Sequence, residues 1–514
     1  MSRPSSPDSA PCEAVRLVGI TKRFGPVVAN RAVDLSVRAG TIHAIVGENG
    51  AGKSTLMAVL AGVLRPDEGQ VWIRGTRLER ADPASAIRLG LGMVYQHFML
   101  VEPLTVAENL VLGQEPTRRG LLDLRAAARA VEELGRTYGL PLDPHRPVES
   151  LSVGERQRVE IGKVLHRGAE VLVLDEPTAV LTPAEVDGLF EMLVRFRDQG
   201  RTVILITHKL DEVLALAERV TVIRRGEAVA EVAAAETTAK ELAHLMVGRE
   251  VALPGERARG EREVDRAGPP ALELDGLTVA GEGRPAVDDL SLRIWPGEVV
   301  GVAGVQGNGQ SELLACVAGL APAAAGAVRI GGEDVTRAPV RRRAAAGLAH
   351  VPEDRHRRGL VLDLSVRENA ILGRHREFRG PLGLSVQRIG AFAEELVRAH
   401  DVRPADPTTA ARGLSGGNQQ KLVVARELTR RPQVLLAGQP TRGVDIGAIE
   451  AIHGHVRDAR DAGSAVLLVS ADLAELLDLA DRIVVMRDGR LVAELPAAGA
   501  TVAALGEQMT GASS

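Results

Sequence analysis

The chain has 514 residues, which is too long for one compact core and predicts two to four domains. Its net charge is −4 with 25% charged residues, so it has no overall basic field of the kind that favours nucleic acid, and no nucleic-acid partner is expected. The two cysteines, Cys12 and Cys316, lie far apart in sequence. They predict no disulfide framework and fit a reducing compartment.

The N-terminus, MSRPSSPDSAPCEA, has no apolar signal region, and residues 1–13 are expected to form a disordered tail. No stretch of the sequence approaches the roughly 18 uncharged apolar residues that are needed to span a bilayer. The sequence therefore predicts no membrane-spanning segment.

The first segment with chemical meaning is GENGAGKST, residues 47–55. It follows the apolar run 42–46, which predicts a strand, and precedes residues 56–64, which have helical spacing. This is the context that a G-x-x-x-x-G-K-[ST] phosphate loop requires. We expect Lys53 to reach the β and γ phosphates and Ser54 to ligate Mg²⁺. A glycine-rich turn that binds nothing is the alternative, and the lysine, the serine and the context all argue against it.

The segment VLVLDEP, residues 171–177, supplies the second half of the predicted site. Four apolar residues predict a buried strand that ends at an acidic pair. Asp175 is expected to hold Mg²⁺ through its water shell, and Glu176 to orient or deprotonate the attacking water. The pair could merely cap the next helix, but together with the phosphate loop it predicts a P-loop nucleoside triphosphatase.

A second stretch, VLLAGQPT (434–441), matches VLVLDEPT (171–178) at a spacing of 263 residues (440 − 177). The same spacing joins LSVGE (151–155) to LSGGN (414–418). The two glycine-rich loops are 257 residues apart (304 − 47). The chain is therefore predicted to be a tandem duplication.

LSVGE and LSGGN both resemble LSGGQ, the signature of ATP-binding cassette (ABC) proteins. From about residue 14 to the C-terminus, the chain resembles the duplicated ATPase subunit of ABC importers for monosaccharides and nucleosides. This resemblance implies an α/β fold of two tandem P-loop ABC ATPase domains, each with a RecA-like core, an antiparallel β part and a helical subdomain. The expected boundaries are 14–248 for domain 1, 249–270 for a charged linker that contains Pro and Gly, and 271–514 for domain 2.

The resemblance implies roles for further residues of the first copy. Phe24 is similar to the aromatic residue on which adenine stacks, Gln96 to the glutamine that touches Mg²⁺ and water, and His208 to the switch histidine that holds the γ-phosphate. The expected catalytic residues are Glu176, His208 and Gln96, and the expected metal ligands are Ser54, Gln96 and Asp175. The expected ATP-binding residues of this copy are Phe24, Gly47, Asn49, Gly50, Gly52, Lys53, Ser54 and Thr55.

The second copy keeps the glycine frame but not the reactive side chains. The residues at the positions of Lys53, Asp175, Glu176 and His208 are Gln310, Gly438, Gln439 and Ala471, in that order. Glu353 stands at the position of Gln96, and no aromatic residue replaces Phe24. We expect this pocket to lack every group that carries charge or proton chemistry, to hold nucleotide weakly through its backbone and not to hydrolyse it well. The expected degenerate site consists of Gly304, Gly309, Gln310, Ser311, Ser152 and Gly154.

ABC cassettes pair head to tail, so the resemblance implies that each ATP lies between the phosphate loop of one copy and the signature of the other. The complete loop would then use Ser415, Gly416 and Gly417. The depleted loop would meet LSVGE, which has Val153 and Glu155 where Gly and Gln are expected. Complete motifs would thus meet complete ones, and the missing carboxylates would mark the non-hydrolytic side of an asymmetric pair.

The resemblance implies a peripheral ATPase on the cytoplasmic face of the cell membrane, with ATP and Mg²⁺ as cofactors. It would power uptake of nucleosides or simple sugars through two integral-membrane permease subunits, with an extracytoplasmic solute-binding protein as an indirect partner. Segments such as QPTRGVDIGAIE resemble nucleoside-type members of this family more closely than ribose- or galactose-type members. The alternatives are a twin-cassette translation or ribosome-associated ATPase and a non-catalytic scaffold. The short linker and the single depleted site argue against the first, and the complete first site argues against the second.

Overall fold

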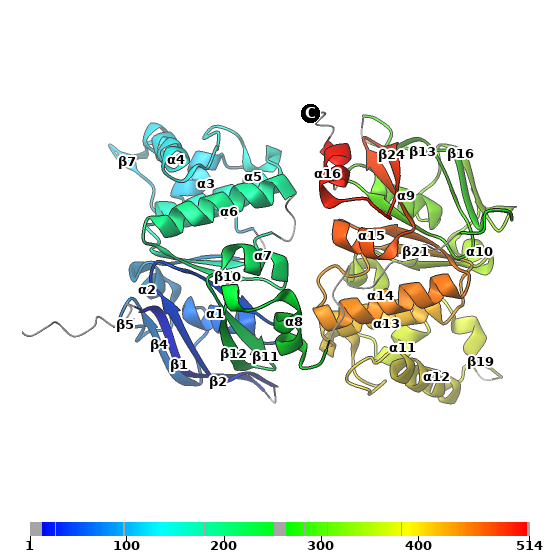
Figure 1. The fold of residues 1–514 in the computed structure, drawn as a ribbon, viewed down its shortest axis with the longest axis horizontal. Helices are drawn as coiled ribbons and strands as arrows, with labels where there is room; N and C mark the ends of the chain where they lie inside the picture. The colour runs from blue at the N-terminus through cyan, green and yellow to red at the C-terminus, as the bar shows by residue number, and fades with distance from the viewer. Residues whose placement is uncertain are drawn as a thin grey trace, which may run out of the picture. The chain divides into compact units, whose positions relative to one another are not determined.

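The computed structural model divides into two compact units, residues 1–251 and 252–514, and the same elements follow one another in the same order in each (Figure 1). The structure describes residues 13–25, 27–95, 98–178, 181, 183–250, 264–281, 283–305, 307–381 and 383–510. Most of the predicted tail and linker, and also Gln96, lie outside these residues. Within them, the predicted α/β fold of two tandem domains is confirmed.

Each unit is built around a six-stranded sheet in which one edge strand is antiparallel and the other strands are parallel. In the first unit, the order is β12-β11-β3-β10-β9-β6, formed by β3 (Ile42–Val46), β6 (Leu91–Val94), β9 (Val171–Asp175), β10 (Thr202–Ile206), β11 (Arg219–Arg224) and β12 (Glu227–Ala233). In the second unit, the order is β24-β23-β15-β22-β21-β18, formed by β15 (Val299–Ala303), β18 (Leu348–Val351), β21 (Val434–Gly438), β22 (Ala465–Val469), β23 (Arg482–Arg487) and β24 (Arg490–Pro496). Strands β3, β9, β10, β15, β21 and β22 are buried along their whole length, which explains their almost uninterrupted aliphatic sequences.

A four-stranded antiparallel sheet lies beside each central sheet, in the orders β2-β1-β4-β5 and β14-β13-β16-β17. Its strands are β1 (Glu13–Phe24), β2 (Val27–Arg38), β4 (Glu68–Ile73), β5 (Thr76–Arg77), β13 (Leu272–Val279), β14 (Val287–Ile294), β16 (Ala325–Ile330) and β17 (Glu333–Asp334). Two small hairpins pair β7 (Thr117–Arg118) with β8 (Leu121–Leu122) and β19 (Arg379–Gly380) with β20 (Gly383–Leu384). In β14 buried and less buried residues largely alternate, as expected for a sheet with one face in the core.

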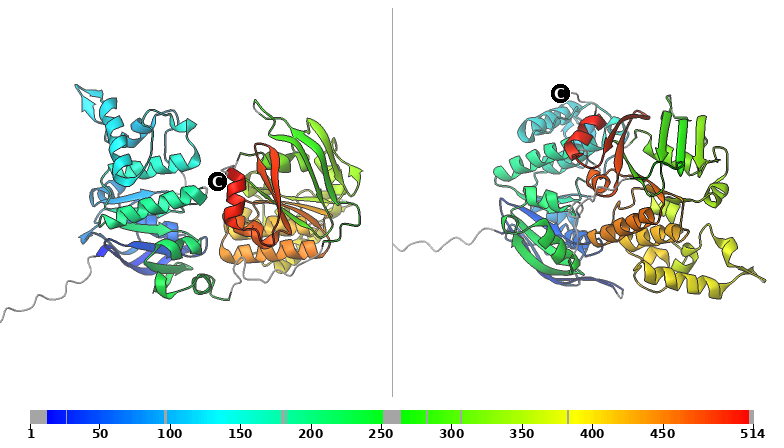
Figure 2. Two further views of the ribbon diagram at one scale, coloured as in Figure 1. Left: turned by 45° about the horizontal axis from the view of Figure 1, so that its top comes forward. Right: turned by 45° about the vertical axis from the view of Figure 1, so that its right-hand side comes forward.

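In the first unit, helices α3, α4 and α5 gather at one end, and the antiparallel strands β1, β2 and β4 lie at the other (Figures 1 and 2). The helices of this unit are α1 (Lys53–Leu60), α2 (Pro83–Arg88), α3 (Val106–Val111), α4 (Leu124–Tyr138), α5 (Val153–His166), α6 (Pro183–Asp198), α7 (Leu210–Leu216) and α8 (Ala239–Val247). Those of the second unit are α9 (Gln310–Val317), α10 (Val340–Ala345), α11 (Val366–Ala370), α12 (Val386–Ala399), α13 (Gly416–Leu428), α14 (Ile446–Asp461), α15 (Leu473–Leu479) and α16 (Val502–Thr510). Short helical turns are η1 (Val148–Ser150), η2 (Ala234–Glu236), η3 (Arg355–Gly359), η4 (His375–Phe378) and η5 (Ala411–Gly413).

The helix predicted over residues 56–64 is found, but its bounds are wrong. It starts earlier, at Lys53, because Gly52 has a left-handed backbone with φ 102° and ends the loop there. It ends at Leu60, shortly before Gly62, which has φ 73°. The spacing of the apolar residues does not reveal that these two glycines set the helix boundaries.

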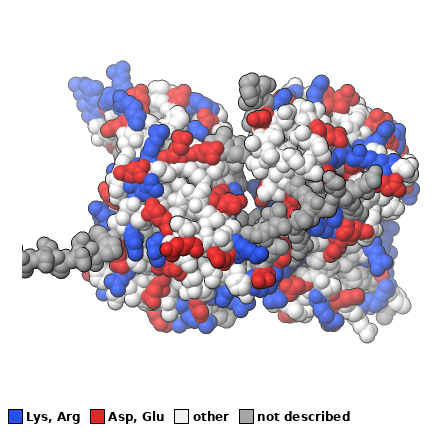
Figure 3. All heavy atoms as spheres, in the orientation of Figure 1, with Lys and Arg blue, Asp and Glu red and all other residues white. Residues whose placement is uncertain are grey.

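Charged side chains of both signs are interspersed over each unit on the face shown in Figure 3. Within the described residues, no helix is long and apolar enough to cross a membrane.

Candidate active site

The loop between β3 and α1 is shaped by glycines that no other residue could replace without a shift of the backbone. A Cβ on Gly47 would lie 2.1 Å from the Ile223 carbonyl oxygen, and one on Gly52 would lie 2.3 Å from that of Ala29. Because these positions have no side chain, the loop can pack tightly at the N-terminus of α1. Such a loop presents backbone N–H groups to an anion.

Lys53 is the first residue of α1, and its side chain turns back over this loop. Its Nζ donates hydrogen bonds to the carbonyl oxygens of Gly47 at 2.7 Å and Glu48 at 3.0 Å. The side chain is buried, with only 6% of the residue exposed. A positive charge is therefore held at the centre of the predicted phosphate loop.

Ser54 and Asp175 meet at the end of β9. The Ser54 hydroxyl lies close enough to the Asp175 carboxylate to lower its pKa. Burial and the neighbouring charge of Glu176 raise the pKa of Asp175, and the Ser54 hydroxyl and the charge of Lys53 oppose this rise. One hydroxyl and one carboxylate beside a phosphate loop fit Mg²⁺, which uses one or two carboxylates together with phosphate oxygens and water. No cage of three or more His, Cys, Asp or Glu side chains is found in the described part of the chain.

Glu176 follows directly, and the neighbouring strand brings His208 to it. Strand β10 pairs in parallel with β9, and Glu176 N–H donates to the Ile206 carbonyl oxygen at 2.9 Å. His208 Nδ1 lies 3.0 Å from Glu176 Oε1. Burial tends to raise the pKa of Glu176, but the bond to His208 and the nearby positive charges outweigh it and hold the pKa below its ordinary value. Glu176 is thus an ionised carboxylate in a fixed orientation, as a base requires.

The backbone at Glu176 is also unusual, with a φ of 49° in the left-handed region. Residues other than glycine adopt this conformation at a cost, and such strain is concentrated at functional sites. Gln439, at the same place in the second unit, has a φ of 45°. The backbone geometry is therefore kept where the carboxylate is not.

Three residues that the sequence analysis did not single out support this strand end. Thr178 Oγ1 donates to Glu212 Oε2 at 2.7 Å, and Lys209 Nζ lies 3.1 Å from Glu212 Oε1. These contacts tie the loop after β9 to the start of α7, next to His208. The signal was available in the duplication, because Glu212 and Glu475 are 263 residues apart (475 − 212) and both are acids.

Of the predicted residues of the first copy, Phe24 lies apart from this cluster, and Gln96 lies outside the described residues. Phe24 ends β1 in the antiparallel sheet, is 48% exposed and has Lys22 Nζ 5.6 Å from its ring centroid. An exposed ring of this kind can accept a stacked base. Gln96 lies outside the described residues, so its role stays a prediction.

The two signature segments each cap a helix, but with different chemistry. Ser152 caps α5 in a capping box: its backbone N–H donates to Glu155 Oε2 at 2.8 Å, and its hydroxyl accepts from Glu155 N–H. A Cβ on Gly154 would lie 2.0 Å from Glu185 Oε1. Two carboxylates therefore lie at this N-terminus, although Arg146 pairs with Glu155.

Ser415 caps α13 with a neutral partner, since the side-chain amide of Asn418 donates to Ser415 Oγ at 2.8 Å. A Cβ on Gly416 would lie 2.9 Å from Arg355 Nη2, and one on Gly417 would lie 2.8 Å from Asp445 Oδ2. The start of α13 thus has one guanidinium and one carboxylate beside it. It is more favourable for an anion than the start of α5.

The second loop keeps the shape of the first. Gly309 has a φ of 101°, and its Cβ would lie 2.0 Å from the Ala286 carbonyl oxygen. Gln310, at the position of Lys53, donates from Nε2 to the Val305 carbonyl oxygen at 3.2 Å. It holds the loop as Lys53 does, without the charge.

The expectation that the second pocket lacks every charged group is wrong in one respect. Ser311 Oγ donates to Glu353 Oε2 at 2.6 Å, so a carboxylate lies at this loop too. Sequence alignment placed Glu353 over a glutamine, and spacing alone could not show that its side chain reaches Ser311. In place of the base and the histidine, Gln439 Oε1 accepts a hydrogen bond from the Ala471 backbone N–H at 3.1 Å.

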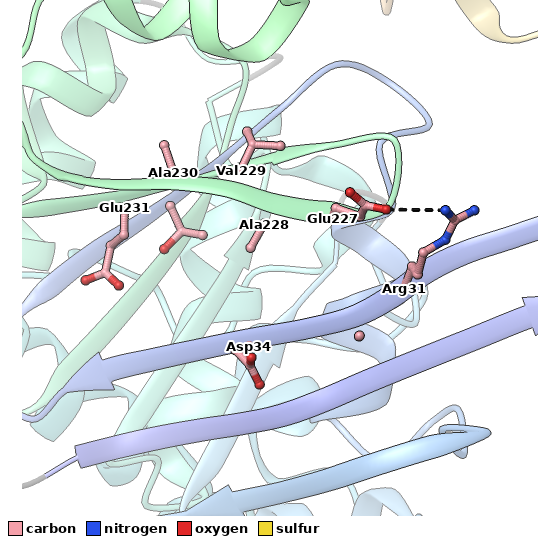
Figure 4. Close-up of a pocket in the computed structure, with 9 residues that line it drawn as sticks. Arg31, Asp34, Glu227, Ala228, Val229, Ala230 and Glu231 are labelled. Carbon is pink, nitrogen blue, oxygen red and sulfur yellow. Dashed lines mark ion pairs between the residues drawn. The ribbon is translucent and has the colours of Figure 1, made fainter.

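A shallow hollow of about 470 Å³ opens elsewhere, between β2, β11 and β12 (Figure 4). Arg31 lies 3.5 Å from Glu227 at its edge, and Asp34 and Glu231 also line it. None of the predicted site residues lines this hollow. The hollow is separate from the phosphate loop, so it does not indicate a different active site.

A glycine loop that holds a lysine, a serine–aspartate pair and an ionised glutamate fixed by a histidine together define a P-loop nucleoside triphosphatase. The family model described as ABC transporter matches residues 30–179 and 287–442, one segment in each unit. The chain therefore belongs to the ABC transporter family of ATP-binding proteins, and it is an ATPase.

Three relatives are similar over almost their whole length. The chain is 46% identical to the nucleoside import ATP-binding protein NupA of Lactococcus lactis, over 93% of this chain and 94% of that protein. It is 44% identical to the guanosine import ATP-binding protein NupO of Bacillus subtilis, over 97% of each. It is also 44% identical to the glucose import ATP-binding protein TsgD13 of Haloferax volcanii, over 97% of this chain and 96% of that protein.

We predict that Glu176→Gln reduces ATP turnover by roughly 10²–10⁴-fold, the usual contribution of a positioned general base. Nucleotide binding should persist, because Lys53 and the loop N–H groups remain. Steady-state phosphate release and equilibrium binding of ATP measure the two effects. Glu132→Gln, which removes an exposed carboxylate from α4 of the same unit, is the matched control and should keep normal turnover. Near-normal turnover of Glu176→Gln would rule out this residue as the base.

Proposed function

We propose that this chain is the ATP-hydrolysing subunit of an importer, which powers the uptake of nucleosides or simple sugars through two membrane permease subunits. The observation that carries the proposal is that the first unit has Lys53, Glu176 and His208 at its phosphate loop, while the second unit has a copy of that loop without them. This occurs in a chain similar from end to end to import ATP-binding proteins. The chain would act at the cytoplasmic face of the membrane, and a solute-binding protein outside the cell would deliver the solute.

Within this class, we favour a nucleoside as the solute. The first two relatives are named for nucleoside and guanosine import, and the third for glucose import. The alternative of a ribosome-associated twin-cassette ATPase gains no support from these relatives. The solute does not touch this subunit, so the preference rests on similarity alone.

In the first pocket, Lys53 and the loop N–H groups would bind the β and γ phosphates of ATP, and Phe24 would stack on the adenine. Glu176 would accept a proton from the attacking water at a carboxylate oxygen. The contact with His208 keeps that carboxylate oriented, and its lowered pKa keeps it ionised. His208 would also hold the γ-phosphate from the end of the neighbouring strand.

Ser54 and Asp175 would hold Mg²⁺, together with Gln96. When bound, this ion neutralises charge that develops on the phosphate oxygens. The proximity of the Ser54 hydroxyl to Asp175, which lowers the pKa of that carboxyl, supports this assignment.

We further propose that the two units pair head to tail, so that the complete loop shares its ATP with the signature that Ser415, Gly416 and Gly417 form. The chemistry at the two helix starts supports this pairing. At α5, a capping box with Glu155 uses the Ser152 backbone N–H and adds negative charge, which disfavours a phosphate. At α13 the cap is neutral, and the guanidinium of Arg355 offsets the nearby carboxylate of Asp445.

On this proposal, ATP draws the units together and hydrolysis in the first pocket releases them. The loops that contain Gln96 and Glu353 would pass the motion to the permeases. The second pocket, with Gln310, Gly438, Gln439 and Ala471, would not hydrolyse nucleotide at a significant rate.

The pairing predicts unequal effects of one substitution at two equivalent positions. Ser415→Arg should abolish hydrolysis, because the bulky side chain would enter the competent pocket, although Ser415 lies far in sequence from Lys53. Ser152→Arg should retain most activity, since it faces the depleted pocket. Phosphate release from the purified importer complex measures both variants. Equal losses in the two would rule out the asymmetric pairing.

Transport itself can be tested in the source organism. A strain that lacks this gene should lose uptake of a radiolabelled nucleoside, and the wild-type gene should restore it while Glu176→Gln should not. Uptake of labelled ribose or glucose in the same strains tests the solute class. Unchanged uptake of all these solutes in the deletion strain would contradict the proposed function.

A further inference from the structure

The helical end of the first unit has a small hairpin whose strands are exposed on both faces. Strands β7 and β8 pair only with each other, and all four of their residues are exposed (Figures 1 and 2). Leu121, in β8, is 75% exposed. A two-stranded hairpin is marginally stable alone in water. Exposed leucines on such an element therefore indicate a surface that a partner covers.

The turn of this hairpin places an arginine at its tip. Arg118 lies opposite Leu121, so Arg119 and Gly120 form a two-residue turn. Both have positive φ values, 56° and 80°, as a type I′ turn requires. Asn or Asp is the usual first residue of this turn, and a longer side chain adopts that backbone at a cost. An arginine at a strained tip indicates a role for its charge.

Positive charge is concentrated around the exposed leucines. Residues 117–129 contain one acid, Asp123, and four arginines, which are Arg118, Arg119, Arg125 and Arg129. All four arginines are exposed, and none forms an ion pair with another described residue. Asp123 caps α4, and its carboxylate accepts from the Ala126 N–H at 3.0 Å. Blue side chains gather in Figure 3 where Figure 1 labels β7, so the tip is both apolar and cationic.

The second unit separates the apolar character of the hairpin from its charge. The caps of α4 and α12, Asp123 and Ser385, are 262 residues apart (385 − 123). At this spacing, the exposed apolar residues Leu122 and Leu124 correspond to two others, Leu384 and Val386, which are also exposed. The three arginines Arg118, Arg119 and Arg125 correspond to Gly380, Pro381 and Gln387. Both hairpins thus share exposed apolar positions, but only the first has arginines at these three places.

The chemistry of the first tip fits an acidic lipid surface better than a protein partner. The energetic centres of protein interfaces are enriched in Trp, Tyr and Arg, and leucine is under-represented there. Residues 113–130 contain no aromatic side chain. Leucines beside unpaired arginines suit the headgroup region of a bilayer, where apolar side chains reach the acyl boundary and cations meet lipid phosphates.

We propose that this hairpin docks the first unit on a bilayer that contains acidic phospholipids, with Leu121 and Leu122 at the acyl boundary and Arg118 and Arg119 on lipid phosphates. The hairpin then lies on the membrane surface and does not span it. A short apolar tip with a few cations gives weak, reversible binding rather than permanent anchoring. The contact is additional to any permease, and it depends neither on the solute nor on the nucleotide chemistry.

Flotation of the purified full chain with lipid vesicles tests the proposal. The chain should bind vesicles of phosphatidylcholine with phosphatidylglycerol but not vesicles of phosphatidylcholine alone. It should dissociate at about 1 M salt, where the Debye length is about 3 Å. Arg118→Gln with Arg119→Gln should weaken binding about 25-fold, because each arginine near an acidic surface contributes a factor of about five. Lysine at both positions should keep the binding.

Leu121→Ser with Leu122→Ser should also weaken binding to the acidic vesicles. Arg77→Gln with Arg80→Gln removes two exposed arginines at and after β5, and this matched control should bind as the wild type does. Unchanged ATP turnover in every variant shows that the first unit remains folded.

Two results would overturn the proposal: a wild-type chain that does not bind acidic vesicles, and equal binding of the wild type and the hairpin variants. If the wild type ignores vesicles and the hairpin variants no longer co-purify with the permeases, the hairpin binds protein instead. None of these outcomes bears on the first ATP site, because the hairpin contains no residue of that site.

Discussion

The contact between His208 and Glu176 joins the ends of two adjacent parallel strands, and the chemistry that we propose for the first unit depends on it. It orients the carboxylate, and together with nearby cations it keeps that carboxylate ionised despite its burial. The pairing of β9 with β10 makes the contact possible, because it brings residues 32 positions apart in sequence to the same edge of the sheet. The bond from Thr178 to Glu212 then fixes the loop that follows.

The second unit shows that this frame does not require the reactive groups. The left-handed backbone recurs at Gln439, and a hydrogen bond from the Ala471 backbone N–H replaces the one to the histidine. Gln310 reproduces the bond of Lys53 to its own loop. Shape and hydrogen bonding are thus retained while the charge that hydrolysis requires is lost, which supports a specialised pocket rather than an eroded one.

Much of the fold and of the first site could be predicted from the sequence, because the motifs that identify them are local. A strand, a glycine loop and a helix follow one another directly around Lys53, and the acid pair follows four apolar residues, so both could be recognised without a structure. The two-domain organisation followed from the internal repeat, and the α/β fold followed from the resemblance to ABC proteins. The helix bounds were wrong by a few residues, because Gly52 and Gly62 determine them and not the apolar spacing.

What could not be predicted depends on contacts between distant residues. Glu353 and Ser311 are 42 residues apart, and only the pairing of β18 with β21 and the space at Gly438 bring them together. The approach of Glu185 to Gly154 and of Arg355 to Gly416 is likewise a matter of packing between elements. These contacts give the two signatures different electrostatic surroundings, a difference that the letters LSVGE and LSGGN express only in part.

The central claim is that one chain contains one hydrolytic and one retaining nucleotide site. A single-turnover experiment tests it most directly: the importer complex is mixed with radiolabelled ATP and Mg²⁺, excess nucleotide is removed rapidly, and the bound nucleotides are separated after several turnover times. The account predicts that half of the bound nucleotide becomes ADP while the other half remains ATP on the protein. Conversion of all bound ATP to ADP at one rate would contradict it.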